Sequence, residues 1–430
     1  MAEDRAGRPQ QPSTDAPGVL ILSGGRLADG RIVDVRLGGG RIQAVGTAGS
    51  LVPAQAEQSR GSLVDLTGYL LLPAPAEPHA HGESAFTADP EEPVACTAQN
   101  VQRRTTEAAL LQLGHGATAL RTHVRIGDVQ GLAALQGALR ARQSLRGLVD
   151  VTVVALPRLL TGTAGADGLA MLRDAVKMGA GVVGGCPDLD PDPSGHTEAV
   201  LHLAAEHGLP VDLHTDAGDP ARLARLASAA AGLATGAVIG PGTGLAGLPQ
   251  PVAARAAEQL AAAGVGVVCL PQGDCAAVAA TRTRSGRGFT PQMAPVRLLR
   301  AAGVRVAAGS GALRDAANPV GRGDPLEAAY LLASLGQAAP EQAYDVVSGQ
   351  ARAALGLAEV RIEAGFPAEL LAVRGERIAA ALSLAYSRIV VHRGRVVART
   401  SAVREYCDSA GAAELELPRQ GPRGEVPGGE

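Results

Sequence analysis

The sequence predicts an α/β protein: a (β/α)8 TIM-type barrel with a small β-sandwich module formed from both ends of the chain. Through the middle of the chain, short apolar runs alternate with alanine-rich helical patterns, as in repeated βα units. Near both ends, short β-type runs are separated by glycine turns, which is typical of antiparallel strands. A doubly wound open sheet is the alternative for the middle. It would not explain why polar residues follow the strand ends around the whole series.

Composition limits the class of protein. The 430 residues exceed one small domain and fit a barrel with an appended module. A formal charge of −3 argues against a nucleic-acid partner. The five cysteines are scattered and odd in number, which favours a reducing compartment over a disulfide framework. The polar N-terminus lacks the apolar region of a secretory signal, and no apolar run is long enough to span a membrane. We therefore expect a cytoplasmic protein with no membrane partner.

The two ends of the chain are expected to form one composite β-module, made of residues 18–66 and 364–404. Its candidate strands are Val19–Leu22, Arg31–Leu37, Arg41–Val45, Ser62–Leu66, Glu369–Val373, Ser387–His392 and Arg395–Arg399. Residues 1–17 and 405–430 are rich in proline, glycine and charge, so we expect a disordered tail at each end.

Residues 67–363 are expected to form the barrel. Its eight candidate strands are Leu70–Leu72, Ala117–His123, Val149–Leu156, Gly181–Gly184, Pro210–Leu213, Ala237–Ile239, Val265–Leu270 and Val304–Ala308. Helical patterns separate them, such as Leu169–Met178, Thr197–His207, Pro251–Ala263 and Pro295–Ala302.

Polar residues just past the strand ends would meet at one mouth of such a barrel, where the chemistry of this fold is found. His79 and His81 are two residues apart after the first run, so an extended chain points both imidazoles to the same side. Two imidazoles on one face provide half of a metal site. The other polar strand ends carry His123, Arg125, Arg158, Cys186, Asp188, His214 and Asp216. The remaining histidines, His115, His196, His202 and His207, are expected on the surface.

Four stretches together give a family likeness. They are Glu77-Pro78-His79-Ala80-His81-Gly82-Glu83, Arg121-Thr122-His123-Val124, Val211-Asp212-Leu213-His214-Thr215-Asp216 and Asn318-Pro319-Val320-Gly321. With the split β-module, they resemble the amidohydrolase superfamily, in its cytosine deaminase-like branch. The resemblance implies one divalent metal, Zn²⁺ or Fe²⁺, that activates water to attack a ring carbon and expel ammonia. It implies His79, His81 and His214 as metal ligands.

The chain also departs from that pattern. The family's histidine after the sixth strand would fall in Ile239-Gly240-Pro241-Gly242, where there is none. Its metal-binding aspartate falls at Gly311, its proton-shuttling glutamate at Ala217, and a substrate-contacting glutamine near Arg158. Asp216 and Glu83 are the candidate catalytic substitutes.

Two functions follow from these residues. The first is hydrolysis of a non-peptide C–N bond in a cyclic amidine or related heterocycle. His123, Arg125 and Arg158 would then bind the substrate, with the arginines suited to an anionic one. The second is a catalytically degenerate homologue that binds a ligand or partner and holds its metal weakly or not at all. The resemblance also implies a homo-oligomer, since barrels of this family often assemble.

Overall fold

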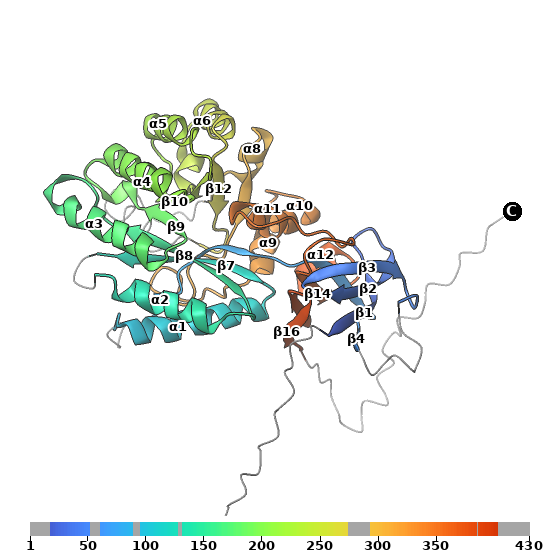
Figure 1. Cartoon of the computed structure of the whole chain (residues 1–430). Coiled ribbons are helices and arrows are strands. Elements are labelled where there is room, and N and C mark those ends of the chain that lie inside the picture. Colours follow the sequence, from blue (N-terminus) through green and yellow to red (C-terminus); the bar gives the residue numbers. More distant parts are fainter. Residues whose placement is uncertain are drawn as a thin grey trace, which may run out of the picture. The chain divides into compact units, whose positions relative to one another are not determined.

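The computed structural model describes residues 18–51, 61–88, 95–127, 131–273, 293–384 and 386–402. In these ranges the chain forms two eight-stranded sheets, one from its middle and one from its two ends (Figure 1). Both predicted terminal tails lie outside the described residues.

The middle of the chain forms the barrel. Its strands lie side by side in chain order, and every neighbouring pair is parallel. They are β6 (Glu77–Ala80), β7 (Ala119–Ile126), β8 (Asp150–Pro157), β9 (Val182–Gly185), β10 (Val211–Thr215), β11 (Ala237–Pro241), β12 (Gly266–Cys269) and β13 (Val306–Ala308). A single bridge between Ala80 and Gly311 brings the end of the last strand back to the first. The predicted (β/α)8 barrel is confirmed.

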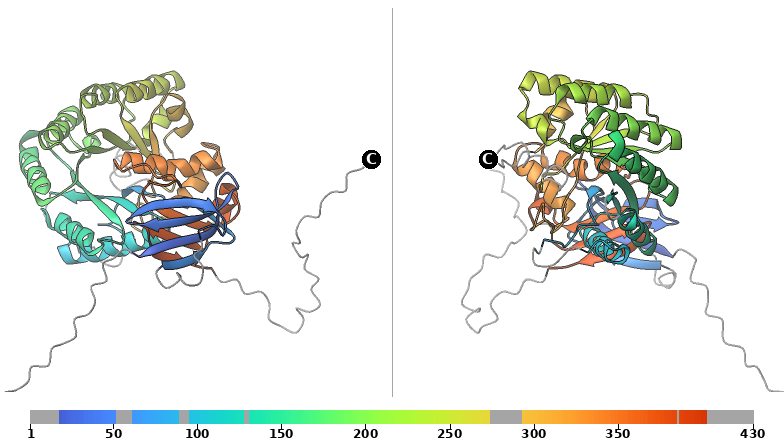
Figure 2. Two further views of the ribbon diagram at one scale, coloured as in Figure 1. Left: turned by 45° about the vertical axis from the view of Figure 1, so that its right-hand side comes forward. Right: turned by 90° about the vertical axis from the view of Figure 1, so that its left-hand side faces the viewer.

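Helices run along the outer side of the barrel strands, as the two views of Figure 2 show. They are α1 (Ala98–Gly114), α2 (Ala133–Ser144), α3 (Gly162–Met178), α4 (Pro193–His207), α5 (Pro220–Ala230), α6 (Gln250–Ala262), α8 (Val296–Ala301), α9 (Pro325–Ser334), α10 (Pro340–Val347) and α11 (Gly349–Ala354). Three of them begin at an Asp-Pro pair, in which the carboxylate accepts an N–H of the first turn and proline supplies a helical φ: α4, α5 and α9. Among the described helices, none combines the length and the apolar character needed to cross a membrane.

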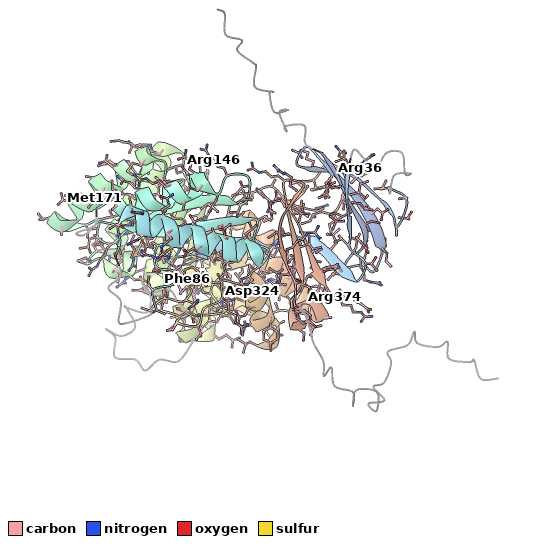
Figure 3. All side chains as sticks on the ribbon, turned by 90° about the horizontal axis from the view of Figure 1, so that it is seen from below. Arg36, Phe86, Arg146, Met171, Asp324 and Arg374 are labelled. Carbon is pink, nitrogen blue, oxygen red and sulfur yellow. The ribbon has the colours of Figure 1, made fainter. Side chains whose placement is uncertain are left out.

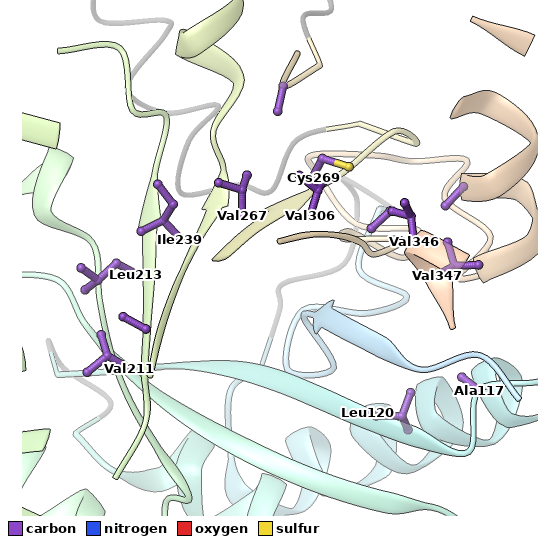
Figure 4. Packing of buried hydrophobic residues seen from close by; sticks show 14 of the residues in the cluster. Ala117, Leu120, Val211, Leu213, Ile239, Val267, Cys269, Val306, Val346 and Val347 are labelled. Atoms are coloured by element: carbon purple, nitrogen blue, oxygen red, sulfur yellow. The ribbon is translucent and has the colours of Figure 1, made fainter. Parts of the chain in front are cut away.

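Alternation along the strands separates the barrel wall from its interior. Val211, Leu213, Ile239 and Val267 belong to the large core cluster that includes residues of the surrounding helices (Figure 4). Residues that alternate with them, such as Val238, Val268 and Ala307, form a small separate cluster, which also includes residues of α11. These interior side chains are short, so the barrel has room for larger polar groups elsewhere along its axis.

The two ends of the chain share the second sheet, with strand order β16-β15-β14-β5-β1-β2-β3 and with β4 paired to β1. The strands are β1 (Val19–Arg26), β2 (Ile32–Gly38), β3 (Arg41–Thr47), β4 (Gly61–Asp65), β5 (Tyr69–Pro73), β14 (Leu370–Arg374), β15 (Arg388–His392) and β16 (Arg395–Thr400), and the short helix α12 (Ile378–Leu384) follows β14. One strand prediction was wrong. Leu70–Leu72 lies in β5, antiparallel to β14, whereas the first barrel strand is β6.

One buried ion pair joins this second sheet to the barrel. Arg388 of β15 donates from Nη1 and Nη2 to the two carboxylate oxygens of Asp324, at 2.8 and 2.7 Å. Asp324, labelled in Figure 3, also caps α9 by accepting the N–H of Leu326. Nη1 of Arg388 donates further to the carbonyl of His115, after α1. A single guanidinium therefore fixes β15 against the ends of two barrel helices.

Candidate metal centre

In three barrel strands, β6, β7 and β10, the alternate residues that face the interior are polar. Because residues two apart on a strand share a face, β6 and the residue after it supply Glu77, His79 and His81. By the same spacing, β7 supplies Arg121, His123 and Arg125, and β10 supplies Asp212 and His214. Asp212 is paired in the sheet with Val238, and His214 with Gly240, so the histidines lie nearer the C-terminal ends of the strands. This is the end at which barrels of this kind carry their chemistry.

Four histidines meet there: His79, His81, His123 and His214. Their ring centroids lie between 4.2 and 5.6 Å apart in all pairs. His79 and His123 are fully buried, and His81 is the most exposed of the four at 8%. The sequence predicted His79, His81 and His214 as one group. It assigned His123 to the substrate, and the structure brings this residue into the same cluster.

The surroundings of the cluster favour the neutral form of its imidazoles. Burial, followed by the charges of the neighbouring histidines, holds the pKa of His79 and of His214 well below the usual range. The pKa of His81 is lowered in the same way by burial, His123 and Arg125. Neutral imidazole is the form of histidine that binds a metal ion.

The distances between nitrogens fit a metal ion. Nε2 of His81 lies 3.3 Å from Nε2 of His79 and 3.2 Å from Nε2 of His214. Nitrogens bound at about 2.0–2.1 Å to a tetrahedral zinc lie about 3.3–3.4 Å from one another, so these two spacings match edges of such a site. His79, His123 and His214 can also each offer a nitrogen such that all three lie within 4.8 Å of one another. Nδ1 of His79 and of His214 is buried and has no hydrogen-bond partner among the described residues.

Glu77 holds the first strand against the last. Its carboxylate accepts the N–H of His79 at 2.9 Å and, across the junction of β6 with the segment after β13, the N–H and hydroxyl of Ser310 at 2.9 and 2.5 Å. Burial raises the pKa of Glu77 to about 7, although the hydrogen bonds from Ser310 and His79 oppose the shift. The side chain therefore fixes the backbone of one cluster histidine to the segment that follows the last barrel strand.

The carboxylate of Asp212 lies beside the ring of His123. Oδ2 of Asp212 lies 3.2 Å from Nε2 of His123 and accepts Nη1 of Arg121 at 2.9 Å. Burial alone would raise the pKa of Asp212, but the charges of His123 and Arg121 outweigh it and lower this pKa. A carboxylate beside an imidazole fixes the orientation and the protonated nitrogen of that ring.

The positions at which the family resemblance implies further active-site groups have other roles in this chain. Gly240 on β11, within the stretch where the resemblance implies a histidine, lies beside His79. Ser310 bonds Glu77, and the N–H of Gly311 donates to the carbonyl of His79. Ala217 has a left-handed φ of 56° and donates its N–H to the hydroxyl of Thr215.

Of the predicted substitutes, Glu83 is buried and tied to Arg125. Its carboxylate accepts Nε of Arg125 at 2.7 Å and the N–H of the same residue at 3.0 Å. Burial raises the pKa of Glu83, while Arg125 opposes the shift. Arg158 is exposed just beyond the end of β8.

Asp216, the other substitute, lines a cavity whose described lining contains none of the four histidines. The cavity has a volume of about 70 Å³ and lies between α4, α5 and the loops that follow β9 and β10. Asp188 lines it as well and accepts both the N–H of Asp216 and the hydroxyl of Thr215, at 2.8 and 2.9 Å. Burial and the neighbouring Asp216 raise the pKa of Asp188.

His196, which was expected on the surface, is fully buried at the start of α4. Its Nδ1 bonds Asp190 at 2.9 Å. Asp190 also accepts the N–H of Leu160 and of Asp192 and bonds the hydroxyl of Thr161, which ties the loop after β8 to the segment after β9. Asp190 and His196 lie on either side of the start of α4, so their pairing depends on the conformation of this loop.

Comparison with known proteins agrees with this fold and cluster. The model of the amidohydrolase family matches residues 98–398, more than two thirds of the chain. The matched segment contains His123 and His214 and begins after His79 and His81. The chain belongs to the amidohydrolase family.

The chain is also similar to individual proteins of known activity. The chain is 27% identical to a pterin deaminase of Rhizobium rhizogenes (strain K84 / ATCC BAA-868) over 71% of each chain. It is 25% identical to an N-isopropylammelide isopropyl amidohydrolase of Pseudomonas sp. (strain ADP), over 38% of this chain and 46% of that one, which is less than half of the relative's length. Among solved structures, 5-methylcytosine deaminase from Klebsiella pneumoniae, liganded with phosphonocytosine, has a TM-score of 0.77 and 22% identity, over 90% of this chain and all of that one.

Proposed function

We propose that this protein binds one divalent metal ion at the histidine cluster and hydrolyses a non-peptide C–N bond in a small heterocycle. The observation that carries the proposal is the set of buried imidazoles with Nε2 atoms 3.2 and 3.3 Å apart. His79, His81 and His214 hold the ion, and His123 completes the set. A divalent ion in this position supplies Lewis-acid activation of the hydrolytic water.

The residues around the cluster have separate tasks. Glu77 fixes the backbone at His79, and Asp212 orients the ring of His123. Asp216 carries the proton from the water to the leaving nitrogen, because it follows His214 by two residues and shares a cavity wall with Asp188. Water adds to the ring carbon, the C–N bond breaks, and ammonia or an amine leaves with that proton.

The names of the relatives support the substrate class. They are a pterin deaminase, an N-isopropylammelide isopropyl amidohydrolase and a 5-methylcytosine deaminase. Each name points to removal of an exocyclic nitrogen from a nitrogen heterocycle. Arg125 and Arg158 give an anionic heterocycle additional donors at the mouth.

The test measures metal content and released nitrogen in the same preparations. Purified protein should carry about one Zn or Fe per chain by mass spectrometry of the elements. It should release ammonia or amine from a panel of pterins, pyrimidines and substituted triazines. His214→Ala should lose the metal. Asp216→Asn should keep it and lose about 10²–10⁴-fold in rate. The control is Asp174→Asn, which changes an exposed carboxylate on α3 outside this cavity, and this variant should retain the rate.

A second candidate function is ligand binding without catalysis. What favours it is that the resemblance implies the family's proton-transferring and metal-binding acids at Ala217 and Gly311, and neither residue carries an acid. Full metal content with no nitrogen released from any member of the panel would contradict hydrolysis and favour this alternative. A cytoplasmic location and a homo-oligomeric state remain predictions, to be checked by fractionation and by light scattering.

A further inference from the structure

A second cavity, of about 100 Å³, lies at the opposite end of the barrel from the histidines. It is lined by residues at the N-terminal starts of four strands, β10 to β13, and by the end of α11 with the loop that follows it. The histidine cluster lies toward the strand ends, so the two sites are separate. We propose that this second cavity binds a small oxyanion, a phosphate or a carboxylate.

The charge of the lining favours an anion. Arg121 and Arg305 both line the cavity, and none of the described residues that line it is acidic. Thr235 and Gln350 add polar side chains to the wall. Arg305 is exposed and donates Nη2 to the carbonyl of Gly264, which uses one of the five N–H groups of a guanidinium. Guanidinium groups match the geometry of carboxylate and phosphate oxygens.

Arg121 supplies the strongest argument, because it is a buried cation whose hydrogen bonds are incomplete. Its side chain is 2% exposed. Nη1 bonds Asp212 and Nη2 donates to the carbonyl of Ala354, while the buried Nε has no hydrogen-bond partner among the described residues. A buried donor without an acceptor costs about 1–3 kcal/mol, and more for a charged group. Nη1 and Nη2 each carry a second N–H, so the guanidinium retains donors for an oxyanion in the cavity beyond those given to Asp212 and Ala354.

Asp212 does not complete the hydrogen bonds of Arg121. It offers Oδ2 to Arg121 and to His123 together, while its Oδ1 is buried without a partner. Asp212 therefore faces one arginine and one imidazole, and the charge of Arg305 at the cavity wall has no acidic residue beside it among the described lining residues. Ala353, exposed in the last turn of α11, lines the cavity and allows a charge to be introduced there without disturbing the core.

The test is calorimetric titration of the full-length protein with inorganic phosphate, and separately with acetate, at constant ionic strength. Ala353→Glu places a negative charge at the cavity and should abolish binding. Ala353→Gln, of the same size and neutral, should leave it nearly unchanged. Arg305→Gln should weaken binding by about tenfold or more, because it removes charge-assisted hydrogen bonds. Arg255→Gln on α6, which removes an exposed arginine elsewhere, should not.

Titration of one further variant with both anions tests whether the histidine cluster is the anion site. His214→Ala should bind phosphate or acetate as the unaltered protein does. The proposal is overturned if neither anion binds, if Ala353→Glu and Ala353→Gln bind equally well, or if His214→Ala loses binding while Ala353→Glu retains it.

Discussion

At Gly240, β11 and β12 approach each other closely. A Cβ added at Gly240 would lie 2.8 Å from the carbonyl oxygen of Val268 and 3.5 Å from Nδ1 of His79. The backbone of β12 lies so close to this glycine that any side chain there would force β11 and β12 apart. A histidine at position 240 would therefore not fit without a shift of one of these two strands.

Asp190 is the residue whose protonation should be most visible in the stability of the protein. Burial would raise its pKa, but the hydrogen bonds from Leu160, Thr161, His196 and Asp192 outweigh this effect and lower the pKa to about 2. A carboxyl group with a lowered pKa stabilises the folded state above its unfolded value near 4, and this stabilisation is lost as the pH falls toward 2.

Asp190→Asn should therefore reduce the free energy of unfolding by about 2–3 kcal/mol at pH 7, and by progressively less below pH 4. The measurement is guanidinium unfolding of both proteins from pH 7 to pH 3. Asp174→Asn, which changes an exposed carboxylate on α3, serves as the control and should shift stability by less than about 0.5 kcal/mol. A deficit for Asp190→Asn that is independent of pH would show that the ionised carboxylate is not what stabilises this loop.

Much of the candidate site was readable at the level of single residues. His79 and His81 were recognisable because a spacing of two on a strand gives one face, and His214 because it ends a strand. His196 was wrongly expected on the surface, and the place of His123 in the histidine cluster was not predicted. Nothing in a sequence states which histidines meet or which acid lies beside them. Asp190 and His196 are close in the sequence, but their pairing depends on the loop conformation after β9.

At the scale of elements, the closure between β6 and β13 depends on one side chain. The two strands share a single backbone bridge, and Glu77 adds three hydrogen bonds across or beside this junction. Glu77→Ala should lower the free energy of unfolding by about 2–4 kcal/mol, because the N–H of Ser310 would be left buried without an acceptor.

Two variants separate this effect from a simple loss of volume. Glu77→Gln keeps the shape and most of the acceptor capacity, and should cost less than Glu77→Ala. Ser310→Ala removes only the hydroxyl bond and should cost about 1 kcal/mol. Chemical unfolding of the three variants decides the point. Equal stability of Glu77→Ala and the unaltered protein would mean that the junction does not depend on this carboxylate.

The elements themselves were largely predictable, with one informative error. Seven of the eight barrel strands coincide with apolar runs, because a parallel strand is buried on both faces. The run Leu70–Leu72 has the same appearance, yet it is buried between β14 and β1 in the other sheet. The true first strand, β6, reads as polar because it carries Glu77 and His79. Hydrophobicity alone therefore selected the wrong one of two adjacent strands.

At the scale of the whole molecule, the pair Arg388–Asp324 connects the sheet of the chain ends to the barrel. Replacing one member leaves the other charge buried, which typically costs about 3–5 kcal/mol. Arg388→Met should show a loss of this size in chemical unfolding. Arg374→Met, which removes an exposed arginine from β14 of the same sheet, should change stability by less than about 0.5 kcal/mol.

The double variant Arg388→Met with Asp324→Asn distinguishes the ion pair from loss of packing. If the pair is the cause, its free-energy cost should be smaller than the sum of the two single costs by about 1 kcal/mol or more. Strictly additive costs would indicate that the two side chains stabilise the molecule independently.

The sheet shared by the two chain ends has a consequence for how the protein is made. Leu70 of β5 pairs with Val373 of β14, so a ribosome must add about 300 residues before the partner strand exists. At about 5–20 residues per second, that takes roughly 15–60 s. During this time the apolar strand β5 has an open edge in the nascent chain, a form prone to aggregation. The yield of folded protein should thus depend on chaperone supply and on the speed of translation, apart from the stability of the finished molecule.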